Sequence, residues 1–286
     1  MKTNHSTDRL LLMQRHLIGI IIAILCLPLP ARALTLEGNL VQGGMAIGKT
    51  DPGATVVYQG KSVRVSPEGL FVIGFARDAA LASEIELHAS SGTVEKHPVH
   101  IEKRTYRIQR IDGLPPRKVS PSPEDLERIY ADIALVKKVR KKDEPRTDFA
   151  QTFIWPVTGR ISGVYGSQRI LNGKPKRPHY GVDIAAPTGT PVKAPADGVV
   201  SMAHEDMFYS GGTLIVDHGH GISTVYMHLH KILVKEGHPV GQGDVIAQVG
   251  ATGRVTGPHL HWGMNWFETR LDPSLLVPPM PKAPPK

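Results

Sequence analysis

Three short patterns in the C-terminal half of the chain combine side chains that bind metals and transfer protons. They are His179-Tyr-Gly-Val-Asp183, His228-Leu-His230 and His259-Leu-His261. In an extended strand, residues two or four positions apart project to the same face. Each pattern can therefore direct both of its functional side chains into one cleft.

The composition limits the metal chemistry that these side chains can support. The chain has 286 residues, 14 histidines and a single cysteine, Cys26. One cysteine excludes a disulfide framework and cysteine-rich zinc sites, so a metal site must use histidine and carboxylate ligands. Two neutral imidazoles and one carboxylate form a tetrahedral zinc site with an open fourth position, which is typical of hydrolytic zinc. Spare histidines can then transfer protons.

The context of the patterns is more informative than any one of them, because each is short enough to occur by chance. Nine of the 14 histidines lie at or after His179. Strand-like segments separate the three patterns, and neighbouring glycines permit close approach of the chain. By contrast, we interpret His88, His97 and His100 as ordinary strand residues.

Seven segments between Phe153 and Pro273, some of which include residues of these patterns, indicate the function more specifically. They are Val164-Tyr-Gly166, His179–Val192, Ala196–Val199, Asp217–Gly221, Tyr226–Leu229, Val249–Gly253 and Thr256–His261. In this order they resemble the catalytic domain of the lysostaphin-type, or LytM-type, zinc metallopeptidases, which cut peptidoglycan peptides. The resemblance does not extend to residues 34–150.

This resemblance implies roles for five residues. His179, Asp183 and His261 would be the ligands of one Zn²⁺ ion in the catalytic domain. His228 and His259 would be the two catalytic histidines that do not bind the metal. One would activate water, while the other would steady the oxyanion or protonate the leaving amine, and the resemblance does not assign the two roles. We interpret the remaining histidines of this segment as surface or supporting residues, namely His204, His218, His220, His230 and His238.

Two functions fit the resemblance. The first is a zinc metalloendopeptidase that hydrolyses peptide cross-links of peptidoglycan, and in a Gram-negative periplasm the family's usual bond is that between D-alanine and diaminopimelate. The second is a non-catalytic wall-binding activator of other peptidoglycan hydrolases, because some family members have lost the metal. The intact set of ligands and catalytic histidines favours the enzyme. Glycan cleavage is a weaker alternative, since no carboxylate pair accompanies the histidines.

Residues 1–33 have the pattern of a secretory signal peptide. Arg9 and Arg15 precede an apolar run at 17–27, and Ala31-Arg-Ala33 predicts cleavage after Ala33. The run is shorter than the roughly 20 apolar residues that span a bilayer. We therefore expect an exported, periplasmic protein, with secretion or anchoring by an uncleaved signal as the alternatives.

The charge balance agrees with an extracellular polymer as the partner. The formal net charge is +8, and a basic exported protein suits an anionic polymer such as peptidoglycan. No nucleic-acid recognition motif is visible, so a nucleic-acid partner is not expected.

The elements around the motifs predict a mainly β protein with a linker helix. Short β-branched and aromatic runs separated by turn signals predict a small β-sandwich over residues 34–110, with one strand from His97 to Ile108. Residues 111–150 form a linker with an amphipathic helix, which begins with Ser122 as N-cap and Pro123 as the first helical residue. Further short strands make 151–273 an all-β peptidase domain. Residues 274–286 form a proline-rich tail, which is predicted to be disordered from Val277 onward.

The sequence does not indicate which role the segment before the peptidase-like domain has. It can act as a lid, orient the enzyme on the wall, or bind other wall enzymes or regulators. One hypothesis is that the helix at 123–142 restrains access to the zinc, because it directly precedes the catalytic domain.

Overall fold

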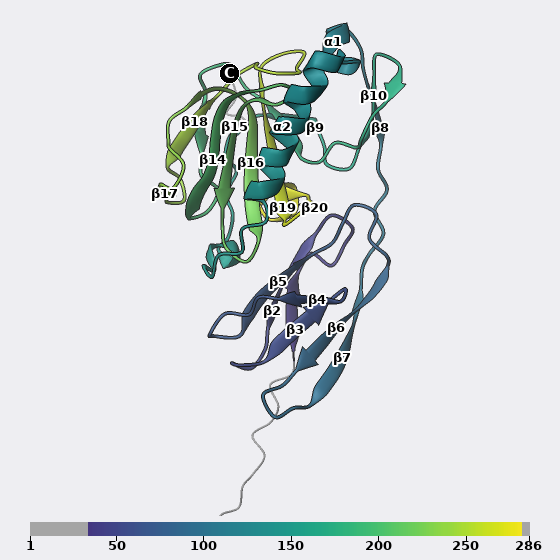
Figure 1. Ribbon diagram of the computed structural model, residues 1–286, viewed down its shortest axis with the longest axis vertical. Coiled ribbons are helices and arrows are strands. Elements are labelled where there is room, and N and C mark those ends of the chain that lie inside the picture. Colours follow the sequence, from purple (N-terminus) through teal and green to yellow (C-terminus); the bar gives the residue numbers. More distant parts are fainter. Residues whose placement is uncertain (1–33, 282–286) are drawn as a thin grey trace, which may run out of the picture. The chain divides into compact units, whose positions relative to one another are not determined.

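Strands make up most of the regular secondary structure, which confirms the mainly β class expected from the sequence. The computed structural model describes residues 34–281 (Figure 1). The predicted signal peptide and its cleavage site lie outside the described residues. Within residues 34–281, no helix combines the length and the apolar character needed to cross a membrane.

The N-terminal residues form two antiparallel sheets that share one core. The alternation of buried and exposed residues in strands such as Thr55–Tyr58 gives each sheet one apolar face. Side chains of both sheets, including Val56, Phe71 and Ile85, are fully buried between them, as expected for a sandwich. The first sheet contains β1 (Thr35–Gly38), β2 (Met45–Lys49) and β5 (Leu70–Gly74). The second contains β4 (Lys61–Val63), β3 (Thr55–Tyr58), β6 (Ala82–His88) and β7 (Val94–His100).

The end of this region differs from the single strand predicted from His97 to Ile108. The structure has β7, and then a separate strand β8 (Ile108–Ile111). β8 pairs in parallel with β10 (Gln168–Leu171), which pairs with β11 (Lys174–Pro175). Between β7 and β8, Arg104 donates to the buried carboxylate of Asp272 at 2.8 Å. This contact and the β8–β10 pairing direct the chain away from the sandwich.

The linker contains the predicted helix, α2 (Pro123–Val139), after a short helix α1 (Pro116–Val119). The side chain of Ser122 accepts a hydrogen bond from the Asp125 amide, and the Asp125 carboxylate accepts one from the Ser122 amide. This capping box fixes the start of the helix at the expected residue. The helix ends at Val139, before the expected limit at residue 142.

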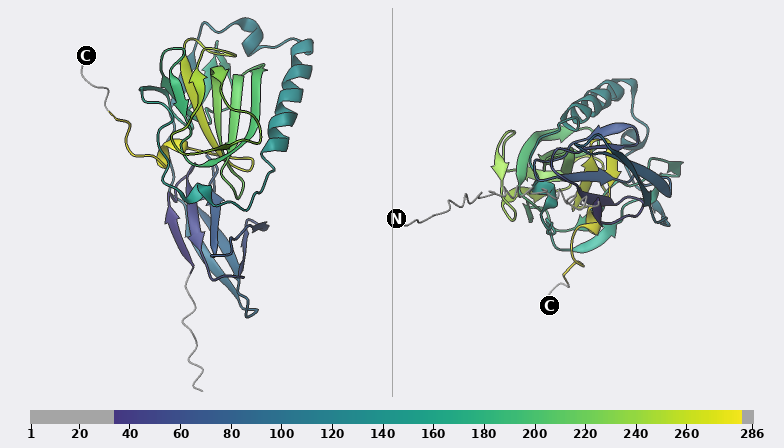
Figure 2. Two further views of the ribbon diagram at one scale, coloured as in Figure 1. Left: turned by 90° about the vertical axis from the view of Figure 1, so that its left-hand side faces the viewer. Right: turned by 90° about the horizontal axis from the view of Figure 1, so that it is seen from below.

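Helix α2 runs beside the strands of the large sheet, as the left view of Figure 2 shows. Val139 is buried there against Met202, Met207 and Val225, with Val136 packed on the same cluster. The helix therefore packs against the large sheet of the C-terminal domain.

The C-terminal domain is built on one large sheet with a mixed set of long and short strands. Seven of its strands lie side by side, each hydrogen-bonded to the next. In order across the sheet they are β17 (Pro239–Val240), β14 (Gly198–Met207), β15 (Gly211–Asp217), β16 (Ile222–Ile232), β19 (His259–Trp266), β12 (Val182–Ala185) and β9 (Arg160–Gly163). β13 (Pro191–Lys193) pairs with β18 (Val245–Val249), β18 also pairs with β16, and β20 (Thr269–Leu271) pairs with β19. Trp262, Tyr226 and Leu260 are fully buried in the core of this sheet. Two short 3-10 helices complete the described elements, η1 (Asp148–Ala150) and η2 (Pro273–Leu275).

The part of the proline-rich tail that the structure describes packs against the domain, contrary to the prediction of disorder. Trp155 Nε1 donates to the Pro278 carbonyl at 2.7 Å. Leu276, Val277 and Met280 contact the core of the large sheet. Proline removes backbone donors but keeps its carbonyl acceptor, so apolar side chains between prolines can still hold such a segment in place.

Candidate active site

The strand register brings two of the predicted metal ligands directly opposite each other. Asp183 on β12 is the cross-strand partner of His261 on β19. His179 lies in the loop that leads into β12, four residues before Asp183. His259 is two residues before His261 on the same strand and therefore on the same face.

The donor atoms of the three predicted ligands converge on one point. Asp183 Oδ1 lies 2.9 Å from His179 Nε2 and 2.8 Å from His261 Nδ1. The two nitrogens are 2.9 Å apart. All three side chains are buried, and together they form a group that could hold a metal ion.

The hydrogen bonds and pKa shifts favour the protonation states that a metal requires. His179 Nδ1 donates to the Val164 carbonyl at 3.1 Å, which leaves the Nε2 lone pair facing the carboxylate. Burial lowers the pKa of His261 to about 4. Burial raises the pKa of Asp183, but the interactions of its carboxylate with the His179 and His261 rings outweigh burial and hold this pKa well below its usual range.

Neutral imidazoles and an ionised carboxylate are the forms that bind a divalent cation. In those forms the lone pairs of His179 Nε2 and His261 Nδ1 and the anionic Oδ1 of Asp183 lie at hydrogen-bonding distance from one another. They repel one another unless a cation or proton lies between them. The donor set therefore fits Zn²⁺, while the assignment of the ligands stays a prediction.

Two glycines provide the space that this arrangement needs. A Cβ added to Gly181 would lie 2.6 Å from His261 Nε2 and 2.6 Å from the Trp262 carbonyl oxygen. A Cβ added to Gly163 would overlap the carboxylate of Asp183. The glycine inside the His179-to-Asp183 pattern is thus a steric requirement of the site.

His228 and His259 lie beside the predicted ligands. Their ring centroids are 4.8 Å apart, and the rings of His228 and His261 are 6.2 Å apart. His228 Nδ1 donates to the Thr252 carbonyl at 2.9 Å, and His259 Nδ1 donates to the Gly257 carbonyl at 2.8 Å. A carbonyl only accepts hydrogen bonds, so each ring keeps its hydrogen on Nδ1 and can accept a proton at Nε2.

The environment keeps His228 neutral. Burial, followed by the neighbouring His259 and His261, lowers the pKa of His228 to about 3. His228 also has a left-handed backbone, with φ 65°, which is uncommon for a residue other than glycine and occurs preferentially at functional sites.

The pattern His228-Leu-His230 does not direct both histidines into the cleft. His230 is exposed, whereas His228 is buried. The left-handed residue and a register shift between Leu229 and Lys231 break the strand alternation there. His218 is a buried supporting residue, because its ring nitrogens contact the Asp197 carbonyl at 2.6 Å and Thr224 Oγ1 at 2.8 Å.

Arg169 contacts the candidate site, and the sequence alone did not single it out. It lies on β10 and donates from Nη2 to Asp183 Oδ2 at 2.8 Å. This bond holds the outer carboxylate oxygen, so that Oδ1 faces the histidines, as outer partners of metal ligands commonly do. The only sequence signal was the basic character of the segment 168–177.

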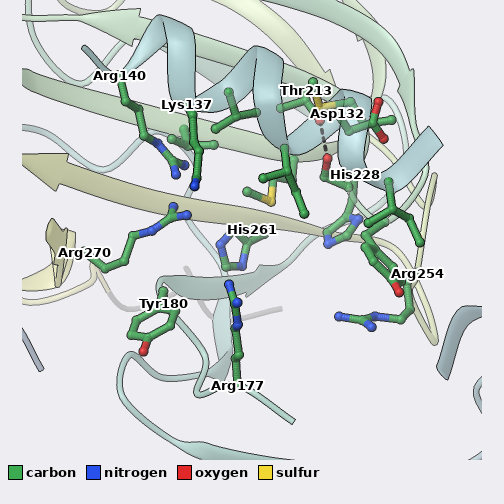
Figure 3. A pocket seen from close by; sticks show the side chains of 18 of the residues that line it. Asp132, Lys137, Arg140, Arg177, Tyr180, Thr213, His228, Arg254, His261 and Arg270 are labelled. Carbon is green, nitrogen blue, oxygen red and sulfur yellow. Dashed lines mark hydrogen bonds between the residues drawn. The ribbon is translucent and has the colours of Figure 1, made fainter. Parts of the chain in front are cut away.

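A groove of about 620 Å³ opens at these residues. His228, His261 and Met227 line it on the sheet side, and Ile129, Ile133 and Val136 of α2 line it on the other. Figure 3 shows α2 crossing over the groove above His261. The helix is therefore one wall of the candidate active site.

Known proteins are similar to this chain both within the C-terminal domain and over most of its length. The model of peptidase family M23 matches residues 177–273. The crystal structure of a chain from Pseudomonas aeruginosa assigned to peptidase M23 is 32% identical, with a TM-score of 0.66, and covers 83% of this chain and 95% of that chain. This chain belongs to peptidase family M23. The M23 structure match includes the N-terminal residues, which the LytM-type resemblance of the sequence does not cover.

Curated relatives match shorter parts of the chain. Peptidoglycan DD-endopeptidase ShyA of Vibrio cholerae is 48% identical over 105 residues, 36% of this chain and 24% of the relative. DD-carboxypeptidase/endopeptidase Mpg of Neisseria meningitidis is 42% identical over 126 residues, 44% of this chain and 29% of the relative. The matched segment thus spans less than a third of the length of these relatives.

Proposed function

We propose that this M23 chain is a zinc-dependent endopeptidase that hydrolyses the peptide cross-links of peptidoglycan. The observation that carries the proposal is the convergence of a His/Asp/His donor set with two further histidines, whose Nε2 atoms can accept protons, beside a groove that His228 and His261 line. The names of ShyA and Mpg support peptidoglycan as the polymer and an endopeptidase as the activity.

In this proposal His179, Asp183 and His261 hold the zinc ion. When bound, zinc supplies a Lewis acid that activates water and polarises a peptide carbonyl. The chain itself provides the proton transfer: His228 and His259, both with Nε2 free, take up the proton of the attacking water and return it to the leaving amine. Arg169 keeps the carboxylate of Asp183 in position.

We further propose that the bond cleaved is the one between D-alanine and diaminopimelate, and that the enzyme acts in the periplasm. The predicted signal peptide supports export, and the term DD-endopeptidase in the name of ShyA supports a bond between two D-centres.

The test is incubation of the zinc-loaded chain from Leu34 onward with purified cross-linked sacculi, with the products resolved by mass. Loss of cross-linked dimers with the native chain, and not with His179→Ala, is the expected result. Intact dimers in both samples would contradict the proposal. An activator would instead increase cleavage by a second wall hydrolase, and His228→Ala would leave that stimulation unchanged.

A further inference from the structure

Four cationic side chains converge at one end of the groove beside His261 (Figure 3). Lys137 and Arg140 come from the last turn and the C-terminal cap of α2. Arg270 comes from β20, and Arg177 precedes β12. Elements that are far apart in the sequence thus supply positive charge to one place, which we call the cation cluster.

The two arginines at the centre of this cluster have few partners of their own. Arg140 is only 7% exposed, and its Nε has no hydrogen-bond partner among the described residues. Arg270 donates from Nη1 to the neutral amide oxygen of Asn265 at 3.0 Å. The ion pairs found within residues 34–281 do not include either arginine, although the exposed Glu268 lies on the same wall. A buried and a half-buried guanidinium group without an ion pair are unfavourable, because their charges repel and much of the surrounding water is excluded.

The pKa shifts agree with this geometry. Burial, followed by the charge of Arg270, lowers the pKa of Arg140 to about 8. Burial also lowers the pKa of Arg270, to about 10. An anion placed between the two groups would compensate both charges.

Arg254 and Asp132, which also line the groove, have contacts within the protein. Arg254, at the opposite end near His228 in Figure 3, donates to the Lys118 carbonyl at 3.2 Å and lies over the ring of Tyr209 at 4.4 Å. The carboxylate of Asp132 accepts the Phe208 amide at 2.7 Å. Arg254 and the four members of the cation cluster are the lysine and arginine side chains of the groove that form no ion pair within residues 34–281, so most of the unpaired positive charge lies in the cluster.

We propose that the cation cluster binds a free carboxylate of the substrate, on the residue that supplies the leaving amine. This inference rests on the proposed function and specifies what the groove selects. In a cross-link between D-alanine and diaminopimelate, the carbon that bears the leaving nitrogen also bears a free carboxylate. That carboxylate lies next to the scissile amide, as the cation cluster lies next to His261. Two guanidinium groups can hold it through paired hydrogen bonds, which a neutral amide cannot replace.

The proposal assigns a second role to helix α2. Lys137 and Arg140 make the helix part of the substrate site, so it contributes to binding as well as covering the groove. Restraint by the helix and recognition by the helix predict opposite effects for a substitution of Arg140. Loss of restraint raises turnover, whereas loss of recognition lowers it.

The experiment uses two synthetic cross-linked peptides that differ only at the carboxylate beside the scissile bond, which is free in one and amidated in the other. The zinc-loaded native chain is expected to have a kcat/KM about ten- to a hundredfold higher for the free carboxylate. Arg140→Gln and Arg270→Gln should each remove most of this preference by slowing the carboxylate peptide, with turnover of the amidated peptide within about twofold of native. Arg140→Lys should retain part of the preference.

Arg160→Gln is the matched control, because Arg160 is an exposed arginine on β9 that does not line the groove. It should keep the native preference. An unchanged preference in both Arg140→Gln and Arg270→Gln, with unfolding temperatures and zinc contents like those of the control, would overturn the proposal. A rise in turnover of both peptides with Arg140→Gln would also overturn it and would favour restraint.

Binding of the same two peptides to the metal-free protein, measured by calorimetry, separates this proposal from the proposed function. If the native chain cleaves neither peptide but binds the carboxylate form about tenfold more tightly, and Arg270→Gln loses that difference, the proposed function fails and the carboxylate site stands. Equal binding of the two peptides overturns the carboxylate site, whether or not cleavage occurs.

Discussion

Replacement of Gly181 by alanine tests whether the position of the His261 ring is essential. The added Cβ would lie 2.6 Å from His261 Nε2, 2.7 Å from its Cε1 and 2.6 Å from the Trp262 carbonyl oxygen. Ordinary contacts at such a position are at least about 3.4 Å, so the ring or the strand must move by nearly an ångström. Gly181 does not have a positive φ, so alanine meets no backbone penalty and the effect is steric.

The magnitude follows from that displacement. A misplacement of about 1 Å costs on the order of a hundredfold in rate, so kcat/KM should fall by about that factor, and zinc affinity should fall with it. Overpacking of a buried position costs about 1–3 kcal/mol, which corresponds to a decrease of about 2–10 °C in the unfolding temperature of a domain of this size. The assay combines zinc competition with a chromophoric chelator, steady-state cleavage of a cross-linked peptide, and thermal unfolding.

Gly241→Ala is the control for this substitution. A Cβ at Gly241 would have its nearest neighbour, Asp244 Oδ2, at 3.4 Å, which is an ordinary contact, and Gly241 does not line the groove. It should change none of the three measurements. Native zinc affinity and native turnover in Gly181→Ala would refute the argument that the glycine is required for close packing against His261.

Three other predictions concern proton transfer, pH and domain contact. His228→Ala should lower kcat by about a hundred- to ten-thousandfold and keep one zinc per chain by metal analysis, since His228 is outside the donor set; loss of zinc would contradict the assignment. Burial lowers the pKa of His218 to about 4, so the unfolded chain takes up its proton first as the pH falls below about 6.5. The metal-free protein should therefore lose stability between about pH 6.5 and 4 in urea titrations, and a slope unchanged in His218→Gln would argue against this origin. Arg104→Leu leaves the buried Asp272 carboxylate without its ion pair, so it should lower the free energy of unfolding by about 3 kcal/mol, and an unchanged urea midpoint would show that the contact contributes little.

The residues of the candidate site were predictable where local sequence determines their geometry. Asp183 and His261 stand in short patterns on strands, and pairing of those strands places them opposite each other. The start of α2 was predictable for the same reason, because the capping box involves only Ser122 and Asp125. Each of these features depends on residues that are close in the sequence or that lie on two paired strands.

Features that depend on contacts between distant segments could not be read in this way. Arg169 reaches Asp183 from β10, whose partner β8 is about sixty residues away in the chain. Arg140 and Arg270 meet only because α2 crosses the groove. His230 was misleading, because strand alternation assumes a regular backbone and His228 departs from it. Proline content was a poor guide to residues 274–281, where Trp155 holds the backbone of Pro278.

The pairing of β8 with β10 has a topological consequence for α2. The helix belongs to a crossover whose two ends are joined by the parallel ladder from Ile108 to Leu171. Beyond its C-terminal end, the Phe149 amide donates to the His218 carbonyl at 3.0 Å and fastens the chain to the large sheet a second time. The helix is therefore a span attached on both sides of the groove, not an arm hinged on one side. Clearing the groove fully requires that one of these two attachments separate, together with the contacts of Val139 and Asp132. Proteolytic nicking between residues 140 and 148 should therefore loosen the C-terminal end of the helix without disturbing the sheet.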